Sequence, residues 1–226
     1  MNFQLEELDK LPRKDIFITI LVGIFTALVW ISVFLRLGTF ENILGFREAA
    51  WGLIFIVPIV YVFGLYLGEW LSRWWAFFKS FAKYVMVGFL NSGVDFAVFN
   101  LLMHATGIDK GPSVSSFKTV SFFVAVTNSY FWNKYWAFEA AGTKTDKGKE
   151  FVKFFVVNVI GAFLNVGITS GVIFAISPQF GFSQVAWNNI AAVIATAIAL
   201  IWNFIGFRLI VFKKSQLILD GQPRQQ

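Results

Sequence analysis

Long stretches without charged residues limit what this chain can fold into more than any other feature. Residues 16–35 form 20 consecutive positions with no charge, and residues 84–103 form 20 positions with a single one, Asp95. At a helical rise of about 1.5 Å per residue, each stretch covers roughly 30 Å, the hydrocarbon thickness of a bilayer. Because strands of a membrane barrel need only about 10 residues, these runs predict membrane-spanning helices.

The composition agrees with a membrane environment and excludes several kinds of site. The chain of 226 residues is 57% hydrophobic and 14% charged, whereas a soluble domain carries about 25% charged residues. It has no cysteine, which excludes disulfides and thiolate metal sites, and its single histidine, His104, is too isolated to anchor a metal. The net charge of +6 is interpreted as a topology signal and as attraction to anionic membrane lipids, without nucleic acid as a partner.

The pattern of apolar runs predicts an all-α fold, a polytopic membrane helix bundle with six transmembrane helices. The expected spans are 16–35, 51–68, 84–103, a fourth that begins near Ser113 and ends near Lys134, 154–176 and 186–207. The expected organisation is a cytoplasmic N-terminal tail at 1–15, an extra pair of helices at 16–78, a four-helix domain at 79–214 and a polar C-terminal tail at 215–226.

The distribution of lysine and arginine predicts the orientation in the membrane. With six spans, fifteen of the 19 cations fall on one side, in the N-terminal tail, the 71–83 connection, the 134–153 segment and the C-terminal end. The other side holds Arg36, Arg47, Lys110 and Lys118. Cytoplasmic loops carry the excess of positive charge, so we expect a multi-pass protein of the cytoplasmic (inner) membrane with both termini in the cytoplasm.

An internal repeat relates the last four spans. Residues 83–95 align without gaps with residues 153–165, and residues 133–138 align with residues 207–212. Each unit contains two spans, so both units keep the same orientation. The expected arrangement is two parallel two-helix repeats about a pseudo-two-fold axis along the membrane normal, which is common in transporters.

Several short motifs in the last four spans carry a resemblance to a known family. The motifs are FAKY at 81–84, VGFLNS at 87–92, SYFWNKYWAF at 129–138, FVKF at 151–154 and WNF at 202–204. Over residues 80–214 the chain resembles the GtrA-like family of small bacterial membrane proteins. The first two spans lie outside the usual four of that family, and Phe207 stands where an asparagine is common.

This resemblance implies a role in cell-surface polysaccharide biosynthesis. GtrA-like proteins are thought to translocate (flip) polyprenyl-phosphate-linked sugars across the cytoplasmic membrane, beside a membrane glycosyltransferase that makes the lipid-linked sugar. The partners expected on this basis are a polyprenyl-phosphate-linked sugar, membrane lipids and a glycosyltransferase. Because four core spans make a thin wall for a sugar-sized path, we also expect a homo-oligomer.

The sugar head group is the part of such a substrate that is hardest to move through hydrocarbon, since unpaired polar groups are costly there. Amide side chains both donate and accept hydrogen bonds, and a carboxylate accepts them from hydroxyls. At the centre of a span, the Asp95 carboxylate should face protein, water or a ligand. The candidate head-group residues are Asn91, Asp95, Asn128, Asn133, Asn165 and Asn203.

Cations at the ends of the spans are the candidates for binding the lipid phosphate. Lys118 lies about one turn inside the expected boundary of its span, so it could extend outward to the interface or reach a phosphate in a cavity. The alternative for all these polar residues is structural: asparagines join helices, and cations fix the topology. The candidate phosphate-binding residues are Lys83, Lys118, Lys134, Lys153 and Arg208.

The sequence offers no basis for catalysis. It has no carboxylate pair, no nucleophile beside a base, no metal-ligand spacing and no phosphate-binding glycine loop, so we expect neither an enzyme nor a cofactor. Two alternatives to a translocase remain open. One is a membrane anchor or regulator of a polyprenyl-phosphate glycosyltransferase, without transport. The other is a small proton-coupled exporter that uses Asp95.

Overall fold

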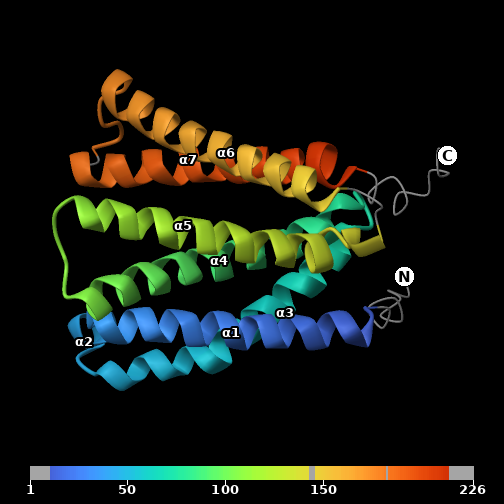
Figure 1. Cartoon of the computed structure of the whole chain (residues 1–226), viewed down its shortest axis with the longest axis horizontal. Helices are drawn as coiled ribbons and strands as arrows, with labels where there is room; N and C mark the ends of the chain where they lie inside the picture. The colour runs from blue at the N-terminus through green and yellow to red at the C-terminus, as the bar shows by residue number, and fades with distance from the viewer. Residues whose placement is uncertain (1–10, 143–145, 182, 214–226) are drawn as a thin grey trace. The chain divides into compact units, whose positions relative to one another are not determined.

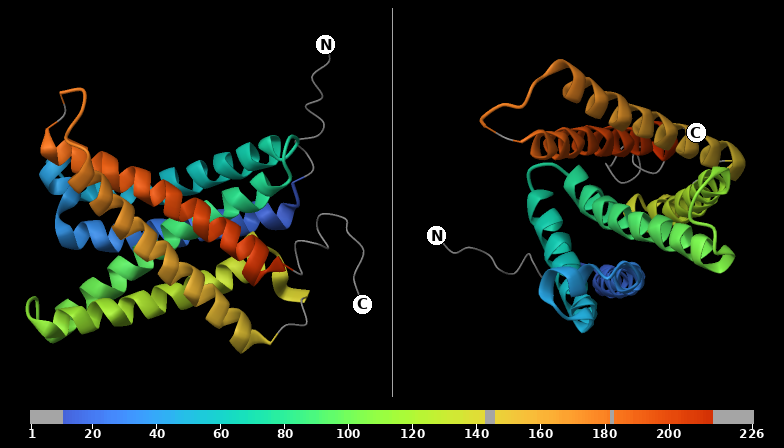
Figure 2. Two further views of the ribbon diagram at one scale, coloured as in Figure 1. Left: turned by 90° about the horizontal axis from the view of Figure 1, so that it is seen from above. Right: turned by 90° about the vertical axis from the view of Figure 1, so that its left-hand side faces the viewer.

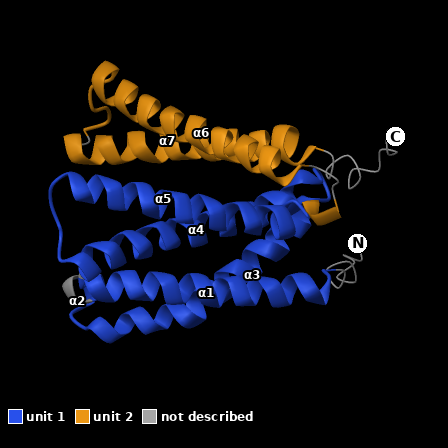
Figure 3. Cartoon of the chain, viewed as in Figure 1, with its two compact units in different colours: residues 1–139 blue, residues 140–226 orange. Residues whose placement is uncertain are grey.

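The computed structural model describes residues 11–142, 146–181 and 183–213, and this part of the chain is helical with no strand. The expected C-terminal tail and most of the expected N-terminal tail lie outside the described residues. The chain divides into two compact units, Met1–Glu139 and Ala140–Gln226 (Figure 3). The predicted all-helical membrane bundle is confirmed.

Unit 1 consists of four long helices that run alternately in opposite directions (Figure 1). Gly64 of α3 lies against Met86 of α4 and Gly68 lies against Ala82, so these two helices are antiparallel. The short segments α2 and η2 occupy the connection between α1 and α3. The elements are α1 (Arg13–Leu37), α2 (Thr39–Leu44), η2 (Arg47–Gly52), α3 (Leu53–Leu71), α4 (Phe77–Thr106), α5 (Pro112–Trp132) and the π-turn η3 (Asn133–Ala137).

Small residues let the helices of unit 1 approach closely. A Cβ atom on Gly68 of α3 would lie 2.5 Å from the Cβ of Ala82 in α4, and one on Gly23 of α1 would lie 2.7 Å from the Cα of Pro58. Two side chains also bond to the backbone of α4: the Tyr61 hydroxyl of α3 donates to the Met86 carbonyl at 3.1 Å, and the Trp30 indole of α1 donates to the Phe89 carbonyl at 3.1 Å. The extra helices α1 and α3 are therefore packed directly against α4, the first helix of the predicted four-helix domain.

Unit 2 is a helical hairpin in which α7 returns along α6 (Figure 2). The Trp202 indole donates to the carbonyl of Val157 at 3.2 Å, and a Cβ on Gly206 would lie 2.6 Å from Cγ1 of Val157. The rings of Phe154 and Phe207 are stacked with centroids 4.2 Å apart. The elements are η4 (Ala140–Gly142), α6 (Lys147–Ala175), α7 (Gln184–Gly206) and the π-turn η5 (Phe207–Val211).

The same local structure ends both hairpins, at the positions that the sequence repeat aligns. In η3 the Phe138 amide donates to the Asn133 carbonyl at 2.9 Å, and in η5 the Phe212 amide donates to the Phe207 carbonyl at 2.8 Å. Both bonds join residues five apart, the spacing of a π-helix. The order helix, connection, helix and π-turn is therefore common to α4–η3 and α6–η5.

The six predicted spans correspond to α1, α3, α4, α5, α6 and α7, with small differences at the ends. Within the described chain, five segments are long and apolar enough to cross a membrane: Arg13–Arg36, Arg47–Leu71, Phe77–Thr106, Lys147–Ala175 and Gln184–Val211. The other predicted span, α5, has 21 residues and so measures roughly 31 Å, but it carries Lys118 and several hydroxyl side chains.

Helix α6 begins earlier than the predicted span at 154–176. The helix begins at Lys147 because Asp146 caps it, accepting hydrogen bonds from the backbone amides of Gly148 at 2.9 Å and Lys149 at 3.3 Å. An aspartate at this position satisfies amides that have no partner inside the helix. The capped helix therefore extends about two turns before the expected start of the span at Phe154.

Candidate functional site

Asp95 of α4 is held by two side chains of α5. Its Oδ2 forms an ion pair with the Lys118 ammonium, and its Oδ1 accepts a hydrogen bond from the Ser121 hydroxyl at 2.6 Å. Ser121 is fully buried, the Asp95 side chain is 21% exposed and the Lys118 side chain is 49% exposed. Each carboxylate oxygen thus has its own donor, and the charge of Asp95 is neutralised inside the hairpin.

Aromatic rings surround the ammonium of Lys118. The centroids of the Phe96 and Phe99 rings each lie 5.6 Å from its Nζ atom. Both rings belong to α4, within about one turn of Asp95. Lys118 therefore neither extends freely to the interface nor stands alone in a cavity, the two arrangements that the sequence left open. It pairs with the carboxylate that the sequence singled out.

Lys83 lies at the opposite end of α4 and is almost completely buried, with 1% of its side chain exposed. Its ammonium donates to Asp15 Oδ2 at 2.9 Å and to Glu139 Oε1 at 2.9 Å. Asp15 comes from the first turn of α1, and Glu139 lies two residues after the end of η3. Three separate parts of unit 1 meet in this cluster, and two carboxylates surround one ammonium.

Asparagines of α4, α5 and η3 leave buried polar atoms without a hydrogen-bond partner among the described residues. These atoms are Oδ1 of Asn91, Nδ2 of Asn128 and Oδ1 of Asn133. The Asn133 side chain is fully buried, and its amide nitrogen donates to the carbonyl of Ser129 at 2.8 Å and to the hydroxyl of Ser129 at 3.1 Å. An unpaired buried polar atom costs about 1–3 kcal/mol, so each of these amides is suited to a ligand that supplies the missing partner.

The two predicted asparagines of unit 2 differ from one another. Asn165 of α6 donates to the Thr196 hydroxyl of α7 at 3.0 Å, so this amide joins the two helices of the hairpin. Asn203 of α7 packs its amide against Gly161 of α6, and its Oδ1 has no partner. The structural alternative thus describes Asn165, whereas Asn203 resembles the unpaired amides of unit 1.

The remaining predicted cations have different surroundings. Lys134 in η3 is buried, and its ammonium donates to the hydroxyl of Tyr130 at 3.2 Å. Lys153 in α6 is exposed, and Arg208 in η5 is half-buried. Among the predicted site residues, Asp95 and Lys118 are the two that the described contacts join to each other. Lys83 is bonded to Asp15 and Glu139, which the sequence did not propose as site residues.

Four residues of these clusters were missed by sequence reasoning. Asp15 was assigned to a cytoplasmic tail, Glu139 lies at the edge of a polar segment, and Ser121 and Trp136 carry no charge. Trp136 is 3% exposed, its indole Nε1 has no hydrogen-bond partner, and its ring centroid lies 6.0 Å from the Lys83 ammonium. Comparison of the two repeats could have singled out Trp136. The aligned residue in η5 is Ile210, which has no hydrogen-bonding side chain, so the two repeats differ at this position.

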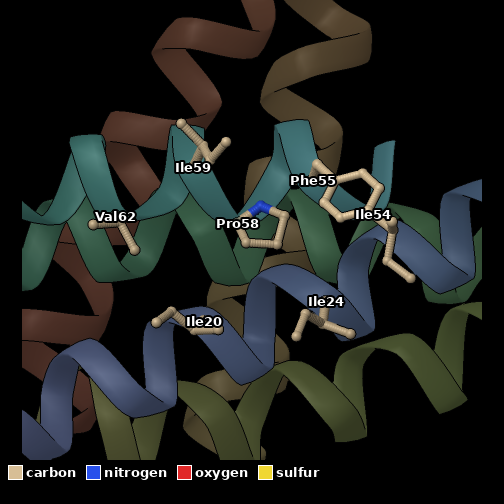
Figure 4. Close-up of a pocket in the computed structure, with 7 residues that line it drawn as sticks. All are labelled: Ile20, Ile24, Ile54, Phe55, Pro58, Ile59 and Val62. Atoms are coloured by element: carbon tan, nitrogen blue, oxygen red, sulfur yellow. The ribbon is translucent and has the colours of Figure 1, made fainter. Parts of the chain in front are cut away.

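An apolar groove of about 550 Å³ lies between α1 and α3 (Figure 4). The side chains that line it carry no polar group, so it offers nothing to a sugar or a phosphate and suits a hydrocarbon chain. The lining residues are Ile20, Ile24, Ile54, Phe55, Pro58, Ile59 and Val62.

Comparison with known proteins assigns the hairpins that carry these clusters. The family described as "GtrA/DPMS, transmembrane domain" matches residues 83–212, from Lys83 at the start of the repeat to Phe212 at its end. The chain belongs to this family. The GtrA/DPMS match confirms the resemblance found in the motifs, and members of the family are generally non-catalytic membrane proteins. Helices α1 and α3 precede the matched residues.

A curated relative agrees with the GtrA/DPMS assignment. The chain is 31% identical over 145 residues to an uncharacterized membrane protein, YngA, of Bacillus subtilis (strain 168), over 64% of this chain and 86% of the relative. No solved structure matches the chain. The family and the relative support a multi-pass membrane protein of glycosyl carrier-lipid biosynthesis.

Proposed function

We propose that this protein translocates a polyprenyl-phosphate-linked monosaccharide across the cytoplasmic membrane during cell-surface polysaccharide biosynthesis. The observation that carries the proposal is the set of unpaired amide atoms on Asn91, Asn128, Asn133 and Asn203, within the helices of the GtrA/DPMS domain. Buried amides without partners are rare in proteins, and a sugar head group offers many hydroxyls that both donate and accept hydrogen bonds.

The chemistry of the unpaired atoms is suited to hydroxyls and not to an anion alone. Asn91, Asn133 and Asn203 each present an acceptor oxygen, and Asn128 presents a donor nitrogen. A phosphate would find repulsion from the oxygens, whereas a hydroxyl can donate to them and accept from the nitrogen. Amides of this kind would replace hydration of the head group while the polyprenyl tail stays in lipid, which lowers the main barrier to crossing.

The Asp95–Lys118 pair favours a translocase over a proton-coupled exporter. A carboxylate that carries protons must gain and lose its charge, but Asp95 has an ammonium on one oxygen and a hydroxyl donor on the other. Both oxygens of the carboxylate are therefore engaged by other side chains of the hairpin. The pair instead allows a polar hairpin to cross the bilayer with its charges balanced.

The proposal is tested by reconstituting the full chain into liposomes that contain a short-chain polyprenyl-phosphate monosaccharide labelled in its sugar. The expected result is faster exposure of the sugar on the opposite leaflet than in liposomes without protein, measured with a membrane-impermeant periodate or lectin reagent. An Asn91→Leu and Asn128→Leu double variant should lose this activity, and Asn100→Leu should keep it. Asn100 is the matched control because its amide donates to the Phe96 carbonyl at 2.8 Å within α4.

Exposure no faster than in protein-free liposomes would contradict translocation. The protein would then be a membrane anchor or regulator of a glycosyltransferase, and affinity purification from its native membrane with that enzyme would be the next measurement. As part of the same proposal, both termini lie in the cytoplasm, and the translocating form is a homo-oligomer, because the four spans of the GtrA/DPMS domain make a thin wall around a sugar.

A further inference from the structure

Two strong hydrogen-bond donors lie close together in unit 1: the indole N–H of Trp136, which has no partner among the described residues, and the ammonium of Lys83, which is bonded to two carboxylates. The Trp136 indole is almost completely buried without an acceptor for its N–H, and its ring is centred 6.0 Å from the Lys83 ammonium. The ammonium itself is bonded to Asp15 and Glu139. An ammonium together with a buried N–H that lacks an acceptor is the donor set that an oxyanion requires.

We propose that Lys83 and Trp136 form a binding site for the phosphate of the carrier lipid, and that Glu139 occupies the ammonium until the phosphate replaces it. This inference rests on the proposed function for the nature of the ligand. Asp15 keeps its bond to Lys83 in both states. The phosphate supplies the indole N–H with an acceptor, which the described part of the chain does not offer.

Glu139 is the carboxylate that can leave. Its side chain is 46% exposed, whereas that of Asp15 is 11% exposed and lies in the first turn of α1. An acidic residue in the first turn is stabilised by the helix dipole, so Asp15 is fixed by its own helix as well as by Lys83. Glu139 follows the π-turn with a backbone φ of 50°, in the left-handed region, and no regular helix restrains it.

The exchange preserves the balance of charge around a buried cation. Before binding, the Lys83 ammonium has two carboxylates; after binding, it has one carboxylate and one phosphate. A lysine that is 1% exposed is never left without a counter-ion, which would be the costly state. The exposed carboxylate of Glu139 meanwhile returns to water, where its charge is hydrated.

Asp15 gives the extra helix pair a part in this site. It lies outside the residues that match the GtrA/DPMS family, whereas Lys83 and Trp136 lie inside them. The Asp15 carboxylate of α1 is 68 positions from Lys83 in the sequence, and it accepts a hydrogen bond from the Lys83 ammonium. In this protein α1 is therefore a positioning element for the phosphate site as well as a packing partner of α4.

The experiment measures binding of geranyl phosphate to the purified full-length protein in detergent, by isothermal titration calorimetry. Glu139→Gln removes the competing carboxylate and leaves Lys83 paired with Asp15, so the dissociation constant should fall about fivefold. Trp136→Phe keeps the ring and removes the N–H, so the dissociation constant should rise about fivefold or more. The matched controls are Glu48→Gln, an exposed glutamate of η2, and Trp132→Phe, whose ring centroid lies 6.2 Å from that of Trp136.

Two further ligands identify what the site recognises. Geraniol, which has the tail without the phosphate, should bind equally to the wild type and both variants. Inorganic phosphate should respond to the variants in the same direction as geranyl phosphate but more weakly. Variant effects that are as large for geraniol as for geranyl phosphate, or that appear for inorganic phosphate alone, would overturn a lipid-phosphate site.

The variants also distinguish a binding role from a structural one. Trp136→Phe removes a buried donor that has no partner, so the unfolding midpoint should be unchanged or higher while affinity falls. Wild-type affinity in either Glu139→Gln or Trp136→Phe would overturn the proposed exchange. Because this assay requires no transport, it remains decisive if the liposome assay fails. Conversely, if the protein translocates the lipid-linked sugar but both variants bind geranyl phosphate as the wild type does, the proposed phosphate site is wrong and the proposed function stands.

Discussion

Asp95 of α4 and Lys118 of α5 form an ion pair inside the first hairpin of the GtrA/DPMS domain. The pair joins the one charged residue of a 20-residue span to the one cation within α5. The buried Ser121 hydroxyl completes the environment of the carboxylate. Because the two partners are unequally exposed, at 21% for Asp95 and 49% for Lys118, removing one or the other should have different consequences.

We expect Lys118→Met to destabilise the protein more than Asp95→Asn does. The first change leaves a mostly buried carboxylate without its cation and should cost about 2 kcal/mol of unfolding free energy. The second leaves a half-exposed lysine that can extend to the interface, and should cost about 1 kcal/mol or less. The double variant should recover most of the loss. Unfolding in mixed micelles with increasing SDS measures all three, and equal losses in both single variants would contradict the pairing.

The unpaired amide of Asn91 predicts a variant that is stable but inactive. Asn91→Leu removes a buried acceptor that lacks a partner, so the unfolding free energy should stay the same or rise by about 1 kcal/mol. The rate of sugar exposure in liposomes should fall about tenfold, since the path loses a hydrogen-bonding group. If Asn91→Leu unfolds more easily and transports at the wild-type rate, the amide has a structural role.

The cluster around Lys83 should respond unequally to loss of the cation and loss of one anion. Lys83→Met leaves the carboxylates of Asp15 and Glu139 facing each other and should cost about 3–5 kcal/mol. Asp15→Asn keeps an ion pair between Lys83 and Glu139 and should cost about 1 kcal/mol. Thermal unfolding in detergent, followed by circular dichroism, compares the two variants. If Asp15→Asn lost more stability than Lys83→Met, the idea that unpaired carboxylates are the costlier outcome would be wrong.

Two glycines of unit 2 provide a matched test of the hairpin contact. A Cβ on Gly206 would lie 2.6 Å from Cγ1 and 3.2 Å from Cγ2 of Val157, a stiff β-branched side chain. Gly206→Ala should therefore cost about 1–3 kcal/mol of unfolding free energy. Nothing lies within 4 Å of the corresponding position on Gly167, so Gly167→Ala should be neutral or stabilise α6 by up to about 1 kcal/mol. Equal effects in the two variants would contradict the packing of α6 on α7.

The orientation of unit 1 can be tested with single cysteines, because the natural chain has none. Ala76 lies in the exposed connection before α4, and Ile108 lies in the exposed connection before α5. In intact protoplasts or spheroplasts, a membrane-impermeant maleimide should label Ile108→Cys at once and Ala76→Cys only after permeabilisation. The reverse pattern would place the lysine-rich side outside and overturn the proposed topology.

Hydropathy and the internal repeat predict most of the fold. Each of the six predicted spans has its helix, and the alignment of residues 133–138 with 207–212 falls on the two π-turns. These features depend on local sequence: an apolar run must be about 20 residues long to span a bilayer, wherever it lies in the chain. The earlier start of α6 was missed because the capping role of Asp146 was not recognised within a polar, lysine-rich stretch.

The partners of the polar residues were harder to predict. The sequence left Lys118 between the interface and a cavity, because its pairing with Asp95 depends on the register of α4 against α5. Asp15 and Glu139 are 68 and 56 positions from Lys83, and nothing in their local sequence indicates a common cluster. Asn165 and Asn203 both lie within predicted spans, so the sequence does not distinguish them. In the structure the Asn165 amide bonds to Thr196, whereas the Asn203 oxygen has no partner among the described residues.

The sequence alone determined that this chain crosses a membrane as helices, that its last four spans are a repeat, and that a few polar groups lie within the spans. Those conclusions follow from the cost of exposing polar groups to hydrocarbon, which each segment meets by itself. Tertiary structure decided which charges neutralise one another and which amides remain unpaired. Such pairings depend on contacts of about 3 Å between separate helices, and only the packing of glycines, prolines and aromatic side chains at the helix crossings fixes them.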